Sequence, residues 1–243
     1  LTQLVRPNVA LVTAVEAAHV EGFGSIENVA IGKAEIFEGL IEGGTAIVNL
    51  DNAYTKKWFE PLSEQFQVLS YSVSSGLDNQ QADFFASEIV PGHEKWSFNL
   101  HFRNDVYPVS LSFLGDHNVA NALAAAACCF AAGISLETIV TGLEAATPYK
   151  GRLQKKMGLL NSVVIDDSYN ANPASVKMAI NALMMFPEKK KILVLGDMAE
   201  LGEAADILHG EIGAFARQAG VTRLMALGAL SVHAASHFGA TAE

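Results

Sequence analysis

Cysteine is scarce in this sequence. Its 243 residues include only two cysteines, Cys128 and Cys129, which are adjacent within an alanine-rich run. Neighbours on one helix are poorly placed to bridge each other, so we interpret both as small apolar residues rather than as a disulfide or a metal-binding pair. This scarcity favours a reducing, cytoplasmic location.

The sequence also has no excess of positive charge. Sixteen lysines and arginines stand against 26 acidic residues, which gives a formal net charge of −10 and a pI near 5.1. This balance argues against non-specific binding to nucleic acid and against binding to an anionic membrane surface. The apolar run at residues 120–132 is too short to cross a bilayer, so we expect no membrane insertion.

Several familiar motifs are missing. The sequence contains no phosphate-binding loop of the form Gly-x-x-x-x-Gly-Lys-Ser/Thr, no Gly-x-Ser-x-Gly elbow and no paired-cysteine motif. His209, His233 and His237 fall on expected helices without a convincing ligand spacing. We expect no secretory leader, and from the start at Leu1 without a methionine we expect a partial segment.

Half of the residues are hydrophobic and 17% are charged, which is typical of a globular protein with one large or two ordinary domains. In the first part we expect buried strands and helices, then shorter alternating strands separated by turns. The expected strands are 8–15, 45–50, 67–71, 84–90, 95–103 and 106–113, and the expected helices are 25–40, 53–65, 117–132 and 135–144.

Residues 146–152 are interpreted as a linker, which divides the chain into domains 1–147 and 148–243. After it, strands ending at Asp166, Leu195 and Leu227 alternate with helices at 174–186 and 203–219, and a further helix starts near Ala229. This alternation predicts an α/β, doubly wound unit with right-handed crossovers.

Residues 163–173 combine a β-branched strand, a polar turn and a helix start at Asn172. Asp166 and Asp167 follow the strand, where ligands bind in open α/β sheets. An ordinary turn explains the same residues about equally well. A second polar loop at 196–202 follows the next strand, and two such loops at one sheet edge favour a binding crevice.

His19, with Glu16 and Glu21 nearby, offers an imidazole and carboxylates to a divalent metal, although a loop histidine without a ligand is the more probable interpretation from these residues. Lys33 lies mid-helix between Gly32 and Ala34, which leave room for a ligand or a modification. A solvated lysine is the alternative.

Asn118 and Asn121 lie three residues apart on the first turn of a helix, so both amides share one face and can contact a purine edge; capping is the alternative. Arg152 lies in the linker and can clamp a phosphate. Asp167 can accept hydrogen bonds from ribose hydroxyls.

Taken together, these segments resemble the ATP-dependent Mur ligases of peptidoglycan synthesis. Each match is weak alone, but seven in family order across almost the whole chain are a strong signal. The matching stretches are residues 6–12, 18–25, 33–37, 115–122, 151–153, 166–173 and 196–202. The last two strings, Asp-Asp-Ser-Tyr-Asn-Ala-Asn-Pro and Gly-Asp-Met-Ala-Glu-Leu-Gly, favour members that add D-alanyl-D-alanine to UDP-N-acetylmuramoyl-tripeptide.

The resemblance implies an acid–amine ligase that phosphorylates a carboxylate with ATP and lets an amine attack the acyl phosphate. It implies Mg²⁺ held by His19 and by Lys33 as a carbamate. It also implies adenine contacts from Asn118 and Asn121, and the dipeptide near Asn170. Arg152 and Asp167 are then the phosphate and ribose contacts. The implied fold is the rear of a central ATPase domain followed by a truncated Rossmann-like domain.

Compared with the family, we expect this chain to lack the UDP-sugar-binding domain, the phosphate-binding loop and the C-terminal end. We therefore expect the chain alone to be inactive and to self-associate through exposed edges, and its parent to be monomeric. Two alternatives stay open: another Mur or folylpolyglutamate-type ligase, and a non-catalytic nucleotide-binding module.

Overall fold

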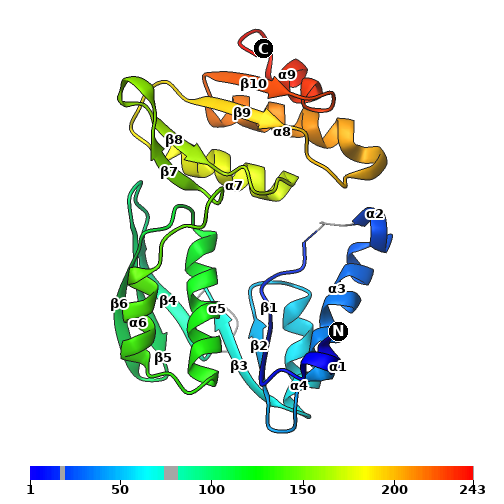
Figure 1. Cartoon of the computed structure of the whole chain (residues 1–243), viewed down its shortest axis with the longest axis vertical. Coiled ribbons are helices and arrows are strands. Elements are labelled where there is room, and N and C mark those ends of the chain that lie inside the picture. The colour runs from blue at the N-terminus through cyan, green and yellow to red at the C-terminus, as the bar shows by residue number, and fades with distance from the viewer. Residues whose placement is uncertain (17–19, 74–81, 243) are drawn as a thin grey trace. The chain divides into compact units, whose positions relative to one another are not determined.

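The computed structural model describes residues 1–16, 20–73 and 82–242, and within them the chain is a mixed α/β protein (Figure 1). It forms two compact units, the first mainly from residues 1–146 and the second mainly from residues 147–242. Leu114 groups with the second unit, where it packs against Leu153, Ala182 and Phe186.

The first unit is organised around a six-stranded sheet in the order β1-β2-β3-β4-β5-β6. The pairings from β1 to β4 are parallel, and those from β4 to β6 are antiparallel. This confirms the predicted change from buried parallel strands to alternating hairpin strands. The strands are β1 (Val9–Val12), β2 (Thr45–Asn49), β3 (Gln67–Ser72), β4 (Phe84–Val90), β5 (Trp96–Phe102) and β6 (Asp105–Leu111).

The helices before and around this sheet are short. The Ser25 side chain accepts a hydrogen bond from Asn28 N and caps α3, and the predicted long helix divides into α3 and the 3₁₀ helix η1. The predicted helix at 53–65 likewise divides into η2 and α4. The elements are α1 (Thr2–Val5), α2 (Val20–Phe23), α3 (Ile26–Ala34), η1 (Glu35–Gly39), η2 (Thr55–Trp58) and α4 (Phe59–Ser63).

The core of the first unit lies around β2, whose five residues are all buried, as expected for a parallel strand covered on both faces. Ala46 and Val48 pack with Phe37, Leu40 and Leu62. The alanine-rich α5 (His117–Ala131) contacts strands β1 to β5, and α6 (Leu136–Ala145) contacts β6 and α5. Small side chains let α5 lie close to the sheet.

The second unit begins with a hairpin and continues with helices and two parallel strands. Asn172 caps α7 through a reciprocal pair of hydrogen bonds with Ser175, which confirms the predicted helix start. The elements are β7 (Gln154–Met157), η3 (Leu159–Asn161), β8 (Val163–Asp166), α7 (Pro173–Met184), β9 (Ile192–Gly196), η4 (Gly202–Ala204), α8 (Ala205–Ala219), β10 (Arg223–Leu227) and α9 (Ser231–Phe238).

The strand pairing of this unit departs from the predicted arrangement. β8 pairs antiparallel with β7, whereas the parallel pair is β9–β10. The expectation that the loops after β8 and β9 follow hydrogen-bonded neighbours in one sheet is therefore wrong. The sequence Gln-Lys-Lys-Met of β7 gives no strong strand signal, because it is mostly exposed and polar.

The core of the second unit is formed by α7, α8 and α9 against β9 and β10. Its fully buried members include Ile180, Ile212, Ala216, Leu224 and Ala234. None of the helices in the described part of the chain has the length and apolarity needed to cross a membrane.

Candidate functional site

The first candidate region lies at the carboxyl ends of β1, β2 and β3, which meet at one edge of the sheet. Polar residues gather there. Asp51 Oδ1 accepts from Ser72 Oγ at 2.5 Å, and Asp51 Oδ2 accepts from Val73 N at 2.6 Å. The buried Thr55 Oγ1 donates to Asn49 O at 2.5 Å. These bonds tie the loop after β2 to the ends of its neighbours.

The segment that follows β1, residues 13–15, has left the strand ladder, although its sequence predicted a strand to residue 15. Its backbone carbonyls accept hydrogen bonds from side chains instead. The bonds are Asn49 Nδ2 to Thr13 O (2.8 Å), Tyr71 Oη to Thr13 O (3.2 Å), Lys33 Nζ to Ala14 O (2.9 Å) and Asn52 Nδ2 to Val15 O (3.1 Å). We call these four side chains the carbonyl clamp.

Two members of the clamp are deeply buried. Asn49 is 7% exposed and Tyr71 is 1% exposed. Burial raises the pKa of the Tyr71 phenol above its ordinary value, so the hydroxyl stays protonated and can donate. Asn49 Oδ1 also accepts from Asp51 N at 2.9 Å, which uses both ends of its amide. Buried polar groups with all partners supplied fix one local conformation.

Lys33 is the clamp member predicted from sequence, and it lies in the last turn of α3. Its side chain is half-buried, and its Nζ donates to the backbone carbonyl of a loop that precedes α2. A solvated lysine is therefore the weaker interpretation. His19 lies outside the described residues. Within the described ranges no three His, Cys, Asp or Glu side chains come together as a metal-binding group.

The predicted asparagine pair lies at the start of α5, where the Asp116 side chain accepts from His117 N at 2.8 Å. Asn121 Nδ2 donates to Asn118 Oδ1 at 3.2 Å, so the two amides do share one face. Asn118 Nδ2 is also 3.2 Å from His117 Nε2. Asn118 is half-buried and Asn121 is exposed.

The predicted residues of the second unit come together around the start of β7 and the end of β8. Asp167 Oδ1 accepts from Leu153 N at 3.0 Å, and Tyr169 N donates to Gly151 O at 3.0 Å. The Arg152 guanidinium carbon lies 4.2 Å from the centre of the Tyr169 ring. Asn170 follows on the surface.

Tyr169 is a residue that sequence reasoning quoted but did not assign. It is 60% exposed, and it stacks under Arg152 while its ring meets that of Tyr149 edge to face at 6.2 Å. Gly151 has a φ of +74°, and a side chain there would contact the Tyr169 backbone. The Gly-Arg pair and the Tyr are thus one local structure, formed by residues about 17 positions apart.

Asp166, left unassigned by the sequence, has a structural role. Its Oδ2 accepts from Lys156 Nζ at 2.5 Å across the hairpin, and its Oδ1 accepts from Ser168 N and Oγ at 3.2 and 2.6 Å. The Lys156 hydrogen bond, followed by those from Ser168, lowers the pKa of Asp166 to about 2. The neighbouring Asp167 is the carboxylate that remains for a ligand.

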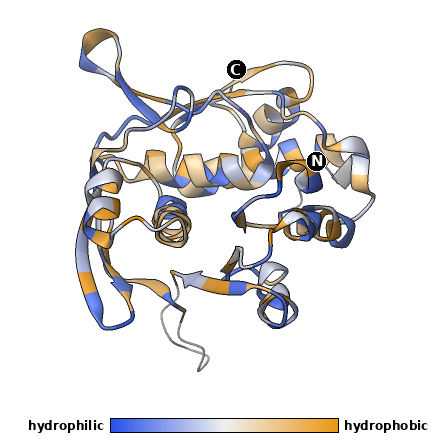
Figure 2. Cartoon of the chain, turned by 60° about the horizontal axis from the view of Figure 1, so that its bottom comes forward, coloured by the Kyte–Doolittle hydropathy of each residue, from blue (hydrophilic) through white to orange (hydrophobic). Residues whose placement is uncertain are grey.

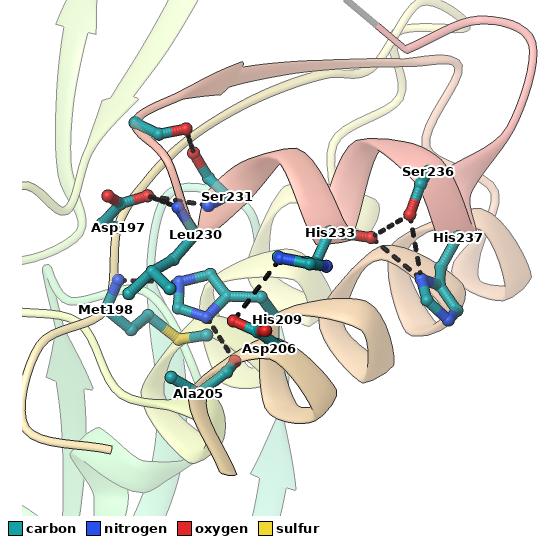
Figure 3. Close-up of polar contacts among 11 residues, drawn as sticks. Asp197, Met198, Ala205, Asp206, His209, Leu230, Ser231, His233, Ser236 and His237 are labelled. Atoms are coloured by element: carbon teal, nitrogen blue, oxygen red, sulfur yellow. Dashed lines mark hydrogen bonds and ion pairs between the residues drawn. The ribbon is translucent and has the colours of Figure 1, made fainter. Parts of the chain in front are cut away.

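The loop at 196–202 was predicted to face a ligand, but its first polar side chain caps a helix (Figure 3). Asp197 Oδ1 accepts from Leu230 N at 3.1 Å and from Ser231 N at 2.7 Å, at the start of α9. The hydrogen bond from the Ser231 backbone is the main cause that lowers the pKa of Asp197, and the bond from Leu230 N adds to it. Gly228 is required beside it, because its φ is +127° and a Cβ would collide with the carboxylate.

His209 is hydrogen-bonded to the same loop from α8. It is fully buried. Its Nε2 accepts from Met198 N at 2.9 Å, and its Nδ1 lies 2.7 Å from Ala205 O (Figure 3). The tautomer with the proton on Nδ1 satisfies both partners.

A cavity of about 390 Å³ lies between α8 and α9, where His233 Nε2 is 3.4 Å from Asp206 Oδ1. It is lined by Asp206, Ile207, Gly210, Glu211, Ala214, His233 and His237.

Two family models match the chain. The Mur ligase middle domain matches residues 1–129, and the Mur ligase, glutamate ligase domain matches residues 151–241. The first match alone covers more than half of the chain.

Curated relatives carry the name UDP-N-acetylmuramoyl-tripeptide–D-alanyl-D-alanine ligase. The protein from Escherichia coli K12 is 39% identical over 233 residues, which are 96% of this chain and 50% of the relative. That from Mycobacterium tuberculosis H37Rv is 32% identical over 250 residues, covering 100% of this chain and 48% of the relative. The chain thus spans about half the length of the curated relatives it matches.

Solved structures give the same grouping. MurF from Acinetobacter baumannii superposes with a TM-score of 0.88 at 32% identity, over 100% of this chain and 51% of that one. MurF from Thermotoga maritima in complex with ADP has a TM-score of 0.80 over 95% of this chain and 51% of that one, and its 21% identity makes this a likeness of fold. The chain belongs to the Mur ligase family.

Proposed function

We propose that this chain forms part of an ATP-dependent ligase that joins D-alanyl-D-alanine to UDP-N-acetylmuramoyl-tripeptide. The observation that carries the proposal is the shared name of relatives such as that from E. coli, which is 39% identical over 96% of the chain. In this proposal residues 1–147 belong to the central ATP-binding domain and residues 148–243 to the C-terminal domain. Both cysteines are free thiols, which suits the proposed cytoplasmic location.

The nucleotide contacts proposed from the sequence suit the local geometry of each unit. Arg152 is an exposed guanidinium that lies over a tyrosine ring, and such a fork can bind phosphate oxygens in pairs. A carboxylate accepts several hydrogen bonds, so Asp167 can accept from ribose hydroxyls while it holds Leu153 N. Asn118 and Asn121 present amides that can contact adenine. Asn170 is proposed to lie near the dipeptide.

Lys33 is proposed to act as a carbamate. The neutral amine attacks CO₂, an N–C bond forms, and one N–H proton leaves, while a second N–H stays on Nζ. That remaining N–H can still donate to Ala14 O, so the observed bond fits both forms of the side chain. The new carboxylate, with His19, would supply a nitrogen and oxygens to Mg²⁺. Bound Mg²⁺ supplies charge neutralisation to the transferred phosphoryl group.

The carbonyl clamp gives this arrangement its precision. Phosphoryl transfer depends on position and charge more than on covalent help from the protein. Asn49, Tyr71 and Asn52 hold the backbone that receives Lys33. The clamp therefore acts on position, and its members need not touch the substrate.

The experiment that tests the function is a chimaera. The stretch of the E. coli relative that aligns with this chain is replaced by residues 1–243, and ligation is followed as D-alanyl-D-alanine-dependent phosphate release and as product by mass spectrometry. We expect ligation, and we expect K33A to lower it by roughly 10–100-fold, the range typical when support for a bound metal is lost. K57A is the matched control, since Lys57 is exposed and lies over the Tyr54 ring.

A chimaera that accepts a free amino acid in place of the dipeptide would favour a sister ligase. A folded chimaera without ligase activity towards any amine would contradict the proposal. If K33A and K57A lower activity equally, the role proposed for Lys33 fails while the ligase assignment stands.

A further inference from the structure

The tip of the β7–β8 hairpin exposes leucines that neither burial nor turn chemistry explains. Leu159 is 89% exposed and Leu160 is 100% exposed. Met157 on β7 is 70% exposed as well. Figure 2 shows the hairpin with hydrophobic colouring at its tip and hydrophilic colouring along an adjoining strand. Large apolar side chains that gather on a projecting turn are a recognised mark of an interaction site.

The turn itself disfavours leucine. Leu160 has φ 54° and ψ 37°, and Asn161 has a φ of 59°, so two consecutive residues occupy the left-handed region. Ser162 N donates to Leu159 O at 3.1 Å and closes the turn. Asparagine, aspartate and glycine are the residues favoured at such positions, and Asn161 fits this preference. Leu160 does not, so folding alone gives no reason for it.

Basic side chains surround the base of the hairpin. Residues 150–156 and 187–191 carry seven of the chain's 16 lysines and arginines, and the acidic residues beside them are Glu188, Asp166 and Asp167. The two stretches are neighbours, because Lys155 Nζ lies 5.8 Å from the centre of the Phe186 ring. Lys191 is buried and Lys156 binds Asp166. The exposed cations of the two stretches include Lys150, Arg152, Lys189 and Lys190.

We propose that the β7–β8 hairpin is a docking element for an anionic lipid surface, with Leu159 and Leu160 entering the headgroup region and the surrounding lysines binding lipid phosphates. Apolar side chains combined with nearby cations are the two signals that give reversible peripheral membrane binding. The net charge of −10 opposes the binding of the whole chain to an anionic surface. Charges in solution act over about a Debye length, so the basic cluster near the hairpin determines the local attraction to lipid.

A protein partner fits these observations less well. A stable protein interface buries about 800 Å² on each side, and a two-stranded hairpin with three strongly exposed apolar side chains offers far less. A lipid surface needs no such area, because a small apolar wedge and several cations are sufficient when they act together. The tip therefore suits a shallow wedge better than a packed interface.

Vesicle sedimentation with the 243-residue chain tests the proposal. Vesicles of phosphatidylcholine alone are compared with vesicles of phosphatidylcholine and phosphatidylglycerol. We expect binding only to the second kind, weakening as salt rises. The variant L159S/L160S should lower the bound fraction roughly tenfold, and K189E/K190E should lower it several-fold. L4S is the matched control, since Leu4 is 85% exposed on α1, and it should bind like the parent.

We expect each variant to keep the parent fold because the substituted side chains are exposed. Circular dichroism checks this. The proposal is overturned if the parent does not sediment with anionic vesicles, or if L159S/L160S binds them as well as the parent. A concentration-dependent dimer that L159S/L160S abolishes, without vesicle binding by the parent, would instead assign the hairpin to contact between copies of this chain.

Discussion

The two candidate regions solve different physical problems. In the first unit the carbonyl clamp uses buried and half-buried side chains, and Asn49 and Tyr71 are almost inaccessible. In the second unit Arg152, Tyr169 and Asn170 lie on the surface, fixed by a few backbone bonds and one stacked ring. The hydrogen bonds of the clamp are made within the protein. Arg152, Tyr169 and Asn170, which we call the surface group, keep their side chains available to a ligand.

This difference teaches which residues should affect stability and which should affect binding. A buried donor that loses its hydrogen bond is poorly compensated by water, so its loss destabilises the fold. An exposed side chain exchanges a protein contact for a water contact, so its loss changes stability little. If substitutions in the clamp and in the surface group changed the free energy of unfolding equally, the two regions would not differ in this way.

The largest effect is expected for N49A. The substitution removes two part-buried hydrogen bonds, the one to Thr13 O and the one from Asp51 N, and each contributes about 1 kcal/mol, so we expect a loss of about 2 kcal/mol in the free energy of unfolding. Trp58 and Trp96 both lie in the first unit, so urea unfolding followed by tryptophan fluorescence reports on that unit.

The matched control is N170A, which changes an exposed asparagine of the second unit and should cost less than about 0.5 kcal/mol. Equal losses for N49A and N170A would remove the distinction between the two regions.

A smaller effect is expected for Y71F, which deletes only the hydroxyl that donates to Thr13 O. One buried hydrogen bond contributes about 1 kcal/mol, so the free energy of unfolding should fall by roughly that amount. Tyr107 provides the comparison, because its hydroxyl donates to Glu137 Oε1 at 3.3 Å on the surface. Y107F should change the unfolding free energy by less than about 0.5 kcal/mol. A Y71F loss no larger than that of Y107F would mean that Asn49 alone supports the carbonyl.

Local sequence patterns predicted much of this fold because they report on local chemistry. Ser25 and Asn172 cap the helices that follow them, and the change from buried to alternating strands marks the change from parallel to antiparallel pairing. The asparagine pair at the start of α5 was also predictable, since helical spacing alone places Asn118 and Asn121 on one face.

What could not be predicted depends on partners far along the chain. Residues 13–15 have the composition of a strand, but their carbonyls bind side chains 19 to 58 residues away. Asp197 follows a strand like a ligand-binding carboxylate, yet the start of α9, more than 30 residues later, takes its oxygen. Nothing local in either segment reports these contacts.

The smallest effect is expected at the hairpin beside the surface group, where Lys156 holds the pKa of Asp166 at about 2, below its ordinary value near 3.8. A lowered carboxylate pKa stabilises the folded state above the unfolded pKa, and this contribution is lost as pH falls through the folded pKa. Replacing Lys156 by methionine should raise the pKa of Asp166 towards its ordinary value, but not fully, because Ser168 still donates twice. The carboxyl carbon of Asp166, titrated by NMR in the parent and in K156M, measures this directly.

The same substitution predicts where stability changes. The difference in unfolding free energy between the parent and K156M should be complete above about pH 5 and should vanish only by about pH 1, because a protonated Asp166 no longer attracts the lysine. K177M is the control, since Lys177 Nζ lies 5.8 Å from the centre of the Phe215 ring in the same unit. If the pKa of Asp166 stays near 2 in K156M, the Ser168 bonds hold the carboxylate by themselves. In that case the turn after β8, and not the hairpin, orders the segment that carries Asp167 and Tyr169.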